Sequence, residues 1–222
     1  KGFAGRFSKT VVPVIFNEGL WGVGTTMYSV FYGRMGDAAV ATMGVCTTIN
    51  DLVWDAIFAL MNATAIIVGK ALGAGDRERA YLYAKRMMAG AVAAGVALGL
   101  LVIAVRWPLV NIFSGLSYPV REKAQFILML GALTIWFRAF NTINIVGVLR
   151  SGGDTLFSLC LDVGTLWLVG VTSTGLAALV FHWPLEWVYA CTFLEEAVKM
   201  ASGIPHFKKR QWMNVLTEQP QG

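Results

Sequence analysis

Six long apolar runs constrain the fold of this chain more than any other feature. A helix that crosses the hydrocarbon core of a bilayer needs about 20 consecutive apolar residues. Only 14% of the residues are charged, whereas a soluble domain carries about 25%. We therefore predict an all-α integral membrane protein with six transmembrane helices. The predicted spans are approximately residues 11–32, 39–68, 81–105, 126–149, 157–181 and 185–203.

The lysine and arginine residues predict which side of the membrane each connection occupies. Most of the 18 fall in segments on the side of residue 1, and such an excess marks the cytoplasmic side. We therefore expect a cytoplasmic linker at 1–9, a six-helix bundle at 10–207 and a cytoplasmic tail at 208–222, in the plasma membrane. The net charge of +5 is explained by this orientation, and we expect no nucleic-acid partner.

Four acidic residues lie inside the apolar runs: Glu18, Asp51, Asp55 and Asp162. A carboxylate at the bilayer centre costs on the order of 3 kcal/mol when it faces lipid. Such residues are expected to face a polar cavity or a charged partner instead. Ionisable groups inside a membrane are typical of proteins that move ions or solutes, so the chain is predicted to take part in transport.

The polar residues of the first run gather near one face. Glu18 and Thr25 share a stripe at helical spacing, Trp21 lies beside it, and Asn17 precedes the glutamate. A carboxylate in a partly desolvated site changes protonation near neutral pH, and the same oxygens can hold Na⁺. Glu18 with Asn17 is therefore the candidate coupling-ion site, and the ion is left open between H⁺ and Na⁺.

The second run also carries a polar stripe. At about 3.6 residues per turn, Asp51, Asp55 and Asn62 share one face of the helix, with Trp54 beside them. We expect this stripe to line a cavity. The alternative is a buried hydrogen-bonded network between helices.

An arginine in the fourth run needs a counter-charge. Arg138 lies on a stripe with Asn141, and the candidate partners are Asp51, Asp55 and Asp162. Because Asp162 follows the turn RSGGDT by two helical turns, we expect it to serve that end of its helix.

In the sixth run, Glu195 and Glu196 precede Lys199 by four and three residues. Side chains at this spacing neighbour each other on a helix. We interpret the three residues as local neutralisation near the inner membrane boundary.

Small residues recur in the third run. Ala91, Gly95 and Gly99 are spaced by four residues, a pattern that lets two membrane helices approach closely. We predict close helix packing at this face.

Two polar turns are expected to be structural and to cap helices at the inner face. Signatures of enzymes such as GxSxG, HExxH and the P-loop are absent from the sequence, so we expect no enzymatic activity, no cofactor and no metal centre. The turns are LGAGDRERA and RSGGDT, and the structural residues assigned to them, together with Asp162 in the span that follows RSGGDT, are Gly73, Gly75, Asp76, Arg150, Gly152, Gly153, Asp154 and Asp162.

The sequence resembles the C-terminal half of a multidrug and toxic compound extrusion (MATE) transporter. The stretches that carry the resemblance are VVPVIFNEGLWGVGTTMYSVFYGRMG, IIVGKALGAGDRERA and GVLRSGGDTLFSLCLD. The resemblance implies one six-helix bundle of a twelve-helix transporter that works by alternating access. It also implies that Glu18 occupies the position of a coupling acid. The fourth helix lacks a second acid found there in some members and offers Arg138, Asn141 and Asn144 instead.

From this resemblance we expect half of a secondary-active multidrug efflux antiporter, exporting small organic cations in exchange for Na⁺ or H⁺. Its partners would be the lipid bilayer and a second six-helix bundle, either the N-terminal half of the same protein or a second copy. The alternatives are a flippase for lipid-linked precursors, with Arg138 on an anionic headgroup, or a non-transporting membrane scaffold subunit. The residues expected to line the substrate cavity are Trp21, Thr25, Tyr28, Asp51, Trp54, Asp55, Asn62, Arg138 and Asn141.

Overall fold

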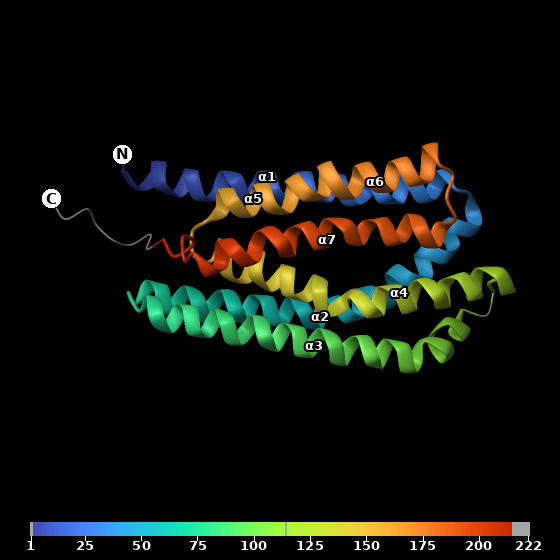
Figure 1. Cartoon of the computed structure of the whole chain (residues 1–222), viewed down its shortest axis with the longest axis horizontal. Helices are drawn as coiled ribbons and strands as arrows, with labels where there is room; N and C mark the ends of the chain where they lie inside the picture. The colour runs from blue at the N-terminus through green and yellow to red at the C-terminus, as the bar shows by residue number, and fades with distance from the viewer. Residues whose placement is uncertain (1, 114, 215–222) are drawn as a thin grey trace.

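Six long helices run side by side along the whole molecule (Figure 1). The structure, a computed structural model, describes residues 2–113 and 115–214, with side chains described from residue 11 onward. The described residues contain no strand, and the prediction of an all-α membrane fold is confirmed. The helices are α1 (Gly2–Arg34), α2 (Asp37–Gly73), α3 (Arg77–Ile112), α4 (Tyr118–Thr142) continued by the π-helix η1 (Ile143–Arg150), α5 (Thr155–Thr165) continued by η2 (Leu166–Val171), α6 (Thr172–Gly175) and η3 (Leu176–Val180), and α7 (Leu185–Lys208).

Four helices in the described part of the chain are long and apolar enough to cross a membrane: Asp37–Gly73, Arg77–Ile112, Tyr118–Arg150 and Thr155–Val180. Helices α1 and α7 are not among these four, and polar and ionisable side chains interrupt both of them. The interruptions are Asn17 and Glu18 in α1, and Glu195, Glu196 and Lys199 in α7.

Helix ends differ from the predicted segment bounds at both ends of the chain. The sequence predicts a linker at 1–9, whereas the helical backbone of α1 begins at Gly2. After α7, Trp212 is fully buried and its indole Nε1 donates a hydrogen bond to the Phe207 carbonyl. The rest of the predicted tail, residues 215–222, lies outside the described residues.

Each of the two polar turns contains a glycine with a positive φ angle. Gly75 and Gly153 have φ angles of 79° and 82°, in the left-handed region that residues with a Cβ avoid. The Asp76 carboxylate accepts a hydrogen bond from the Arg79 backbone N–H at 2.9 Å and so caps the start of α3.

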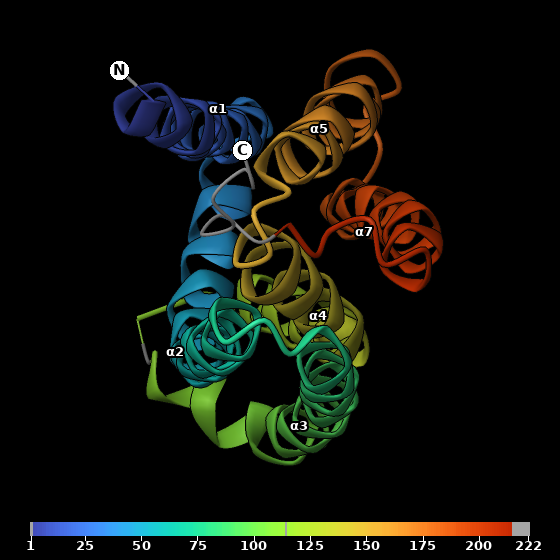
Figure 2. The same ribbon diagram turned by 90° about the vertical axis from the view of Figure 1, so that its left-hand side faces the viewer.

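Helix α4 lies in the middle of the bundle, between α7 on one side and α2 and α3 on the other (Figure 2). Its contact with α3 is close because glycines on α3 remove the side chains in between. A Cβ on Gly95 would collide with the backbone of Trp136, and one on Gly99 with the Ala132 carbonyl oxygen. The predicted close packing at these residues is confirmed.

Two large apolar clusters fill the bundle on either side of its middle, and a third, small one lies between α2, α3 and α4. Leu161 on α5 belongs to one cluster, and Leu166, the first residue of η2, belongs to the other. Along α7, Cys191 belongs to the cluster near the α1–α2 turn and Phe207 to the other. Asp162 and residues 195–199 lie between these positions on their helices. The fold therefore places a polar layer at mid-depth, enclosed by apolar packing.

Candidate functional site

A network of ion pairs joins helices α1, α4, α5 and α7 and the π-helix η1 in this polar layer. The network residues, called here the ion-pair network, are the acids Glu18, Asp162, Glu195 and Glu196 and the bases Arg138, Arg150 and Lys199.

Lys199 is the centre of the network. Its Nζ lies 3.1 Å from Asp162 Oδ1, 3.6 Å from Glu195 Oε1 and 4.0 Å from Glu196 Oε1. The side chain is only 5% exposed, and a lysine so buried needs paired charge around it. The pairing within α7 agrees with the interpretation of local neutralisation. The ion pair from Lys199 to Asp162 on α5 goes beyond it.

Arg150 connects α1 to α5. Its guanidinium lies 2.7 Å from Glu18 Oε1 and 3.3 Å from Asp162 Oδ2. Asn17 donates a second hydrogen bond to Asp162 Oδ2 at 3.1 Å. Because Arg150 is the first residue of the RSGGDT turn, the expected link between Asp162 and this turn is present. The sequence did not indicate the other two partners of Asp162, which are Asn17 and Lys199.

The α7 acids have further partners on α1 and α4. Tyr28 donates its hydroxyl hydrogen to Glu195 Oε2 at 2.9 Å. Asn141 donates to Glu196 Oε2 at 2.7 Å, and Arg138 Nε lies 3.8 Å from Glu196 Oε1. The carboxylate partner of Arg138 is thus Glu196 and none of the three aspartates that the sequence suggests.

Arg138 has one more neighbour. Its guanidinium carbon lies 4.8 Å from the centre of the Trp54 ring, within the range of a cation–π interaction. This contact links the network to α2, where the predicted cavity stripe lies.

Glycine and π-helical backbone make room for the network. A Cβ on Gly170 would collide with the Glu195 carboxylate and the Tyr28 hydroxyl, so the pair can form only because this residue has no side chain. Gly170 lies in η2, and Arg150 is the last residue of η1. π-Helical turns inside α-helices occur frequently at functional sites.

The stripe on α2 lies outside the network. Asp51, Asp55 and Asn62 are exposed, and the two aspartates have no ion-pair or hydrogen-bond partner among the described residues. Trp21 on α1 is 41% exposed. The nearby Thr25 hydroxyl bonds to its own helix, at the carbonyls of Trp21 and Gly22. Within this chain these residues lie on uncovered faces of α1 and α2.

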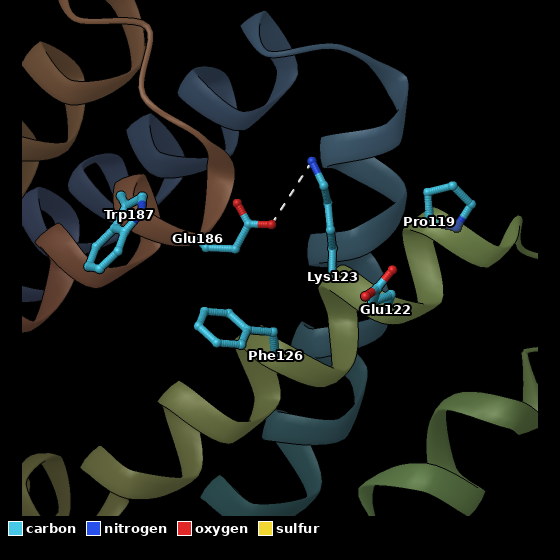
Figure 3. Close-up of a pocket in the computed structure, with 6 residues that line it drawn as sticks. All are labelled: Pro119, Glu122, Lys123, Phe126, Glu186 and Trp187. Carbon is cyan, nitrogen blue, oxygen red and sulfur yellow. Dashed lines mark ion pairs between the residues drawn. The ribbon is translucent and has the colours of Figure 1, made fainter.

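A hollow of about 450 Å³ lies between the beginnings of α4 and α7 (Figure 3). Phe126 and Trp187 contribute exposed aromatic rings, and Lys123 Nζ lies 4.0 Å from Glu186 Oε1. Glu186 precedes Glu195 on the same helix by roughly 14 Å at 1.5 Å per residue, so the hollow is separate from the network. Sequence analysis does not single it out as a site.

Sequence analysis also missed the importance of Glu195, Glu196 and Lys199. The available signal was the presence of ionisable side chains in the middle of an otherwise apolar run. The spacing of these three residues suggests that they only neutralise each other within α7. The sequence of one helix cannot show that Asp162 faces them from α5.

Comparison with known proteins agrees with the fold. The MatE family model matches residues 13–171, more than half of the chain, and this chain belongs to that family of membrane transporters. No curated protein matches the sequence.

Solved structures share the fold. A mutant of the Vibrio cholerae MATE transporter VcmN is 20% identical with a TM-score of 0.86, over 99% of this chain and 49% of that one. A MOP superfamily transporter from Pyrococcus furiosus Vc1 is 14% identical with a TM-score of 0.84, over 97% of this chain and 48% of that one. The chain thus spans about half the length of these transporters and has the fold of one half of them.

Proposed function

We propose that this chain is one half of a secondary-active efflux transporter that exports small organic cations in exchange for Na⁺ or H⁺ by alternating access. The observation that carries the proposal is the unequal charge of the ion-pair network. Four carboxylates face three cationic side chains, so with every group ionised the network has one uncompensated negative charge. Asp162, Glu195 and Glu196 are buried, whereas Glu18 is 59% exposed. A negative charge left without compensation beside buried ion pairs is unfavourable, and one monovalent cation restores the balance.

Glu18, with Asn17, is proposed as the point of exchange between this network and the substrate path. Its side chain is 59% exposed, while its partner Arg150 reaches inward to the buried Asp162. A cation or proton that neutralises Glu18 weakens its pair with Arg150. The change is transmitted directly to Asp162 and from there to Lys199.

The proposed substrate path follows the uncovered faces of α1 and α2. Exposed carboxylates at Asp51 and Asp55 and the indole of Trp21 have the chemistry that attracts lipophilic cations. A second six-helix bundle is the proposed partner that closes this path, with the start of α1 and the end of α7 on the cytoplasmic side of the plasma membrane.

The test is uptake of a fluorescent organic cation into inverted membrane vesicles, with Na⁺ and H⁺ gradients imposed separately. The proposal requires that at least one gradient drives uptake and that its collapse stops it. Vesicles that hold folded protein and respond to neither gradient contradict it, and that result is expected of a non-transporting scaffold subunit.

A flippase for lipid-linked precursors is the second candidate, and Arg138 favours it. Its side chain is 35% exposed and its carboxylate partner is at 3.8 Å, which leaves the guanidinium able to bind an anionic headgroup. The P. furiosus transporter is described as having a binding pocket of reversed polarity that suggests a different function. Loss of lipid transport in Arg138→Ala, with cation export preserved, would establish this second function.

A further inference from the structure

The uncompensated charge of the network can be assigned to one residue from the distances. Asp162 has two cations, Lys199 at 3.1 Å and Arg150 at 3.3 Å. Glu18 has Arg150 at 2.7 Å and is also largely exposed to its surroundings. Neither of these acids lacks compensation.

The two acids on α7, Glu195 and Glu196, depend on the remaining cations, Arg138 and Lys199. Glu196 has Arg138 at 3.8 Å, Lys199 at 4.0 Å and a hydrogen bond from Asn141 at 2.7 Å. Among the described residues, the only ion pair of Glu195 is with Lys199 at 3.6 Å, and that ammonium lies closer to Asp162, so Glu195 has no cation of its own. Glu195 is also buried, at 7% exposure. It is the least compensated carboxylate of the network.

The surroundings of Glu195 suit a proton better than Na⁺. An ammonium at 3.6 Å repels a second fixed cation in a site of low dielectric. Tyr28 approaches Oε2 as a donor, so it presents a hydrogen rather than a free lone pair. The titratable and charged groups that face Glu195 or share its cation are Tyr28 on α1, Arg138 on α4, Asp162 on α5, and Glu196 and Lys199 on α7.

We propose that Glu195 is the proton-binding group of this chain, so that the ion bound by the network is H⁺. The proton comes from water, forms an O–H bond on the Glu195 carboxylate and returns to water when that bond breaks. Protonated Glu195 leaves Lys199 to Asp162 and Glu196, which makes the network neutral. The role of this protonation in transport rests on the proposed function above, whereas proton binding to Glu195 is independent of that function.

The direct test is infrared difference spectroscopy on the 222-residue chain in liposomes during a pH titration, without any transport. We expect the C=O stretch of one buried carboxylic acid to appear as the pH falls. Glu195→Gln should abolish this band, while Glu122→Gln, at an exposed carboxylate outside the network, should retain it. A band that persists in Glu195→Gln, a band lost in Glu122→Gln, or the absence of any titrating buried carboxyl overturns the proposal.

A second variant keeps the test decisive if Glu195→Gln does not fold. Tyr28→Phe removes the hydrogen bond that stabilises the ionised carboxylate, so the midpoint of the titration should move to higher pH. Tyr32→Phe is the matched control, one turn further along α1 in the apolar cluster, and should leave the midpoint unchanged. Equal midpoints for the two variants contradict the assignment to Glu195.

The failure of this proposal is distinguishable from failure of the proposed function. If Na⁺ at constant pH removes the band, the network binds Na⁺ and proton binding is only its competitor, which overturns the assignment of H⁺. Vesicles that show no cation export while the Glu195 band titrates contradict the transport function and leave the proton site standing.

Discussion

Lys199 is the residue on which the ion-pair network depends most. It is the only cation within 4.0 Å of Glu195 among the described residues, and Asp162 and Glu196 share it. Removing one partner of a buried ion pair costs about 3–5 kcal/mol because the remaining charge is left unpaired. Lys199→Met should therefore lower the thermal stability of the purified chain markedly. Lys70→Met, at an exposed position on α2, should leave it unchanged. Equal melting temperatures for the two variants would show that the network is not the buried charge system described here.

Glu18 is expected to behave in the opposite way. Because its carboxylate is more than half exposed, Glu18→Gln should leave folding intact, and Arg150 should keep its pair with Asp162. Ion-driven export, measured by cation uptake into inverted vesicles, should be abolished. Glu122→Gln, an exposed carboxylate at the other end of the bundle, is the control. Wild-type uptake in Glu18→Gln contradicts the role of Glu18 in coupling.

At the residue scale, the sequence predicted the presence of buried charge but not its pairing. Arg138 clearly needed a carboxylate, and four-residue spacing clearly linked Glu195 to Lys199. The choice of Glu196 for Arg138, and of Asp162 as the nearest partner of Lys199, depends on which helices lie next to each other. Helical periodicity gives the face of one helix and carries no information on the helix opposite.

At the scale of elements, the contact between α3 and α4 depends on the absence of side chains. A Cβ on Gly95 meets the Trp136 backbone, which cannot rotate away as a flexible side chain can. Overpacking of this kind typically costs about 1–3 kcal/mol, so Gly95→Val should lower the stability of the chain in mixed detergent micelles. Gly90→Val, on the same helix in open space, removes the same backbone freedom without the collision. A similar loss in both variants would attribute the effect to helix propensity rather than packing.

The missing side chain of Gly170 leads to a similar prediction for the ion-pair network. Gly170→Ala places a methyl group where Tyr28 meets Glu195, so the infrared titration midpoint of the buried carboxyl should shift. Gly164→Ala, on the same long helix with nothing near its Cβ position, should have no effect. If both variants titrate as the wild type, the carboxyl observed is not Glu195.

The helices themselves could be predicted because apolar runs of sufficient length have one stable form in a bilayer. The exact ends of the helices could not be predicted, because hydropathy indicates which residues lie in lipid and not at which residue a helix ends. The π-helical segments also escaped prediction. One of them, η2, contains Gly170, whose missing Cβ leaves space for Glu195, and such contacts exist only in the folded bundle.

At the scale of the whole molecule, the uncovered polar stripe of α2 is expected to become an internal surface. Asp55→Cys, in a chain with the exposed Cys160 replaced by serine, should react readily with a hydrophilic thiol reagent in detergent. Addition of a second six-helix bundle should slow the reaction several-fold, because the stripe is then enclosed. Lys85→Cys, exposed on α3, should react equally in both preparations. Unchanged reactivity at position 55 contradicts the cavity assignment.

The sequence also predicted that six helices with central charge need a second bundle, and the chain spans only 48–49% of the transporters that share its fold. The order of the helices around the bundle axis was not predictable. All of them have apolar faces that suit either lipid or a neighbour, so hydropathy does not distinguish the two.

The two apolar clusters above and below the ion-pair network determine how an ion can reach it. Packed side chains separate the polar layer from water along the bundle axis, from Phe31 to Leu166 on one side and from Leu161 to Phe207 on the other. From residue 11 onward, where the side chains of α1 are described, the second cluster has no member on this helix, and there Glu18 is open to the surroundings. In the transport cycle proposed above, ions therefore enter this half from the side, across the face of α1, so the same rotation that turns this face toward one aqueous compartment closes it to the other.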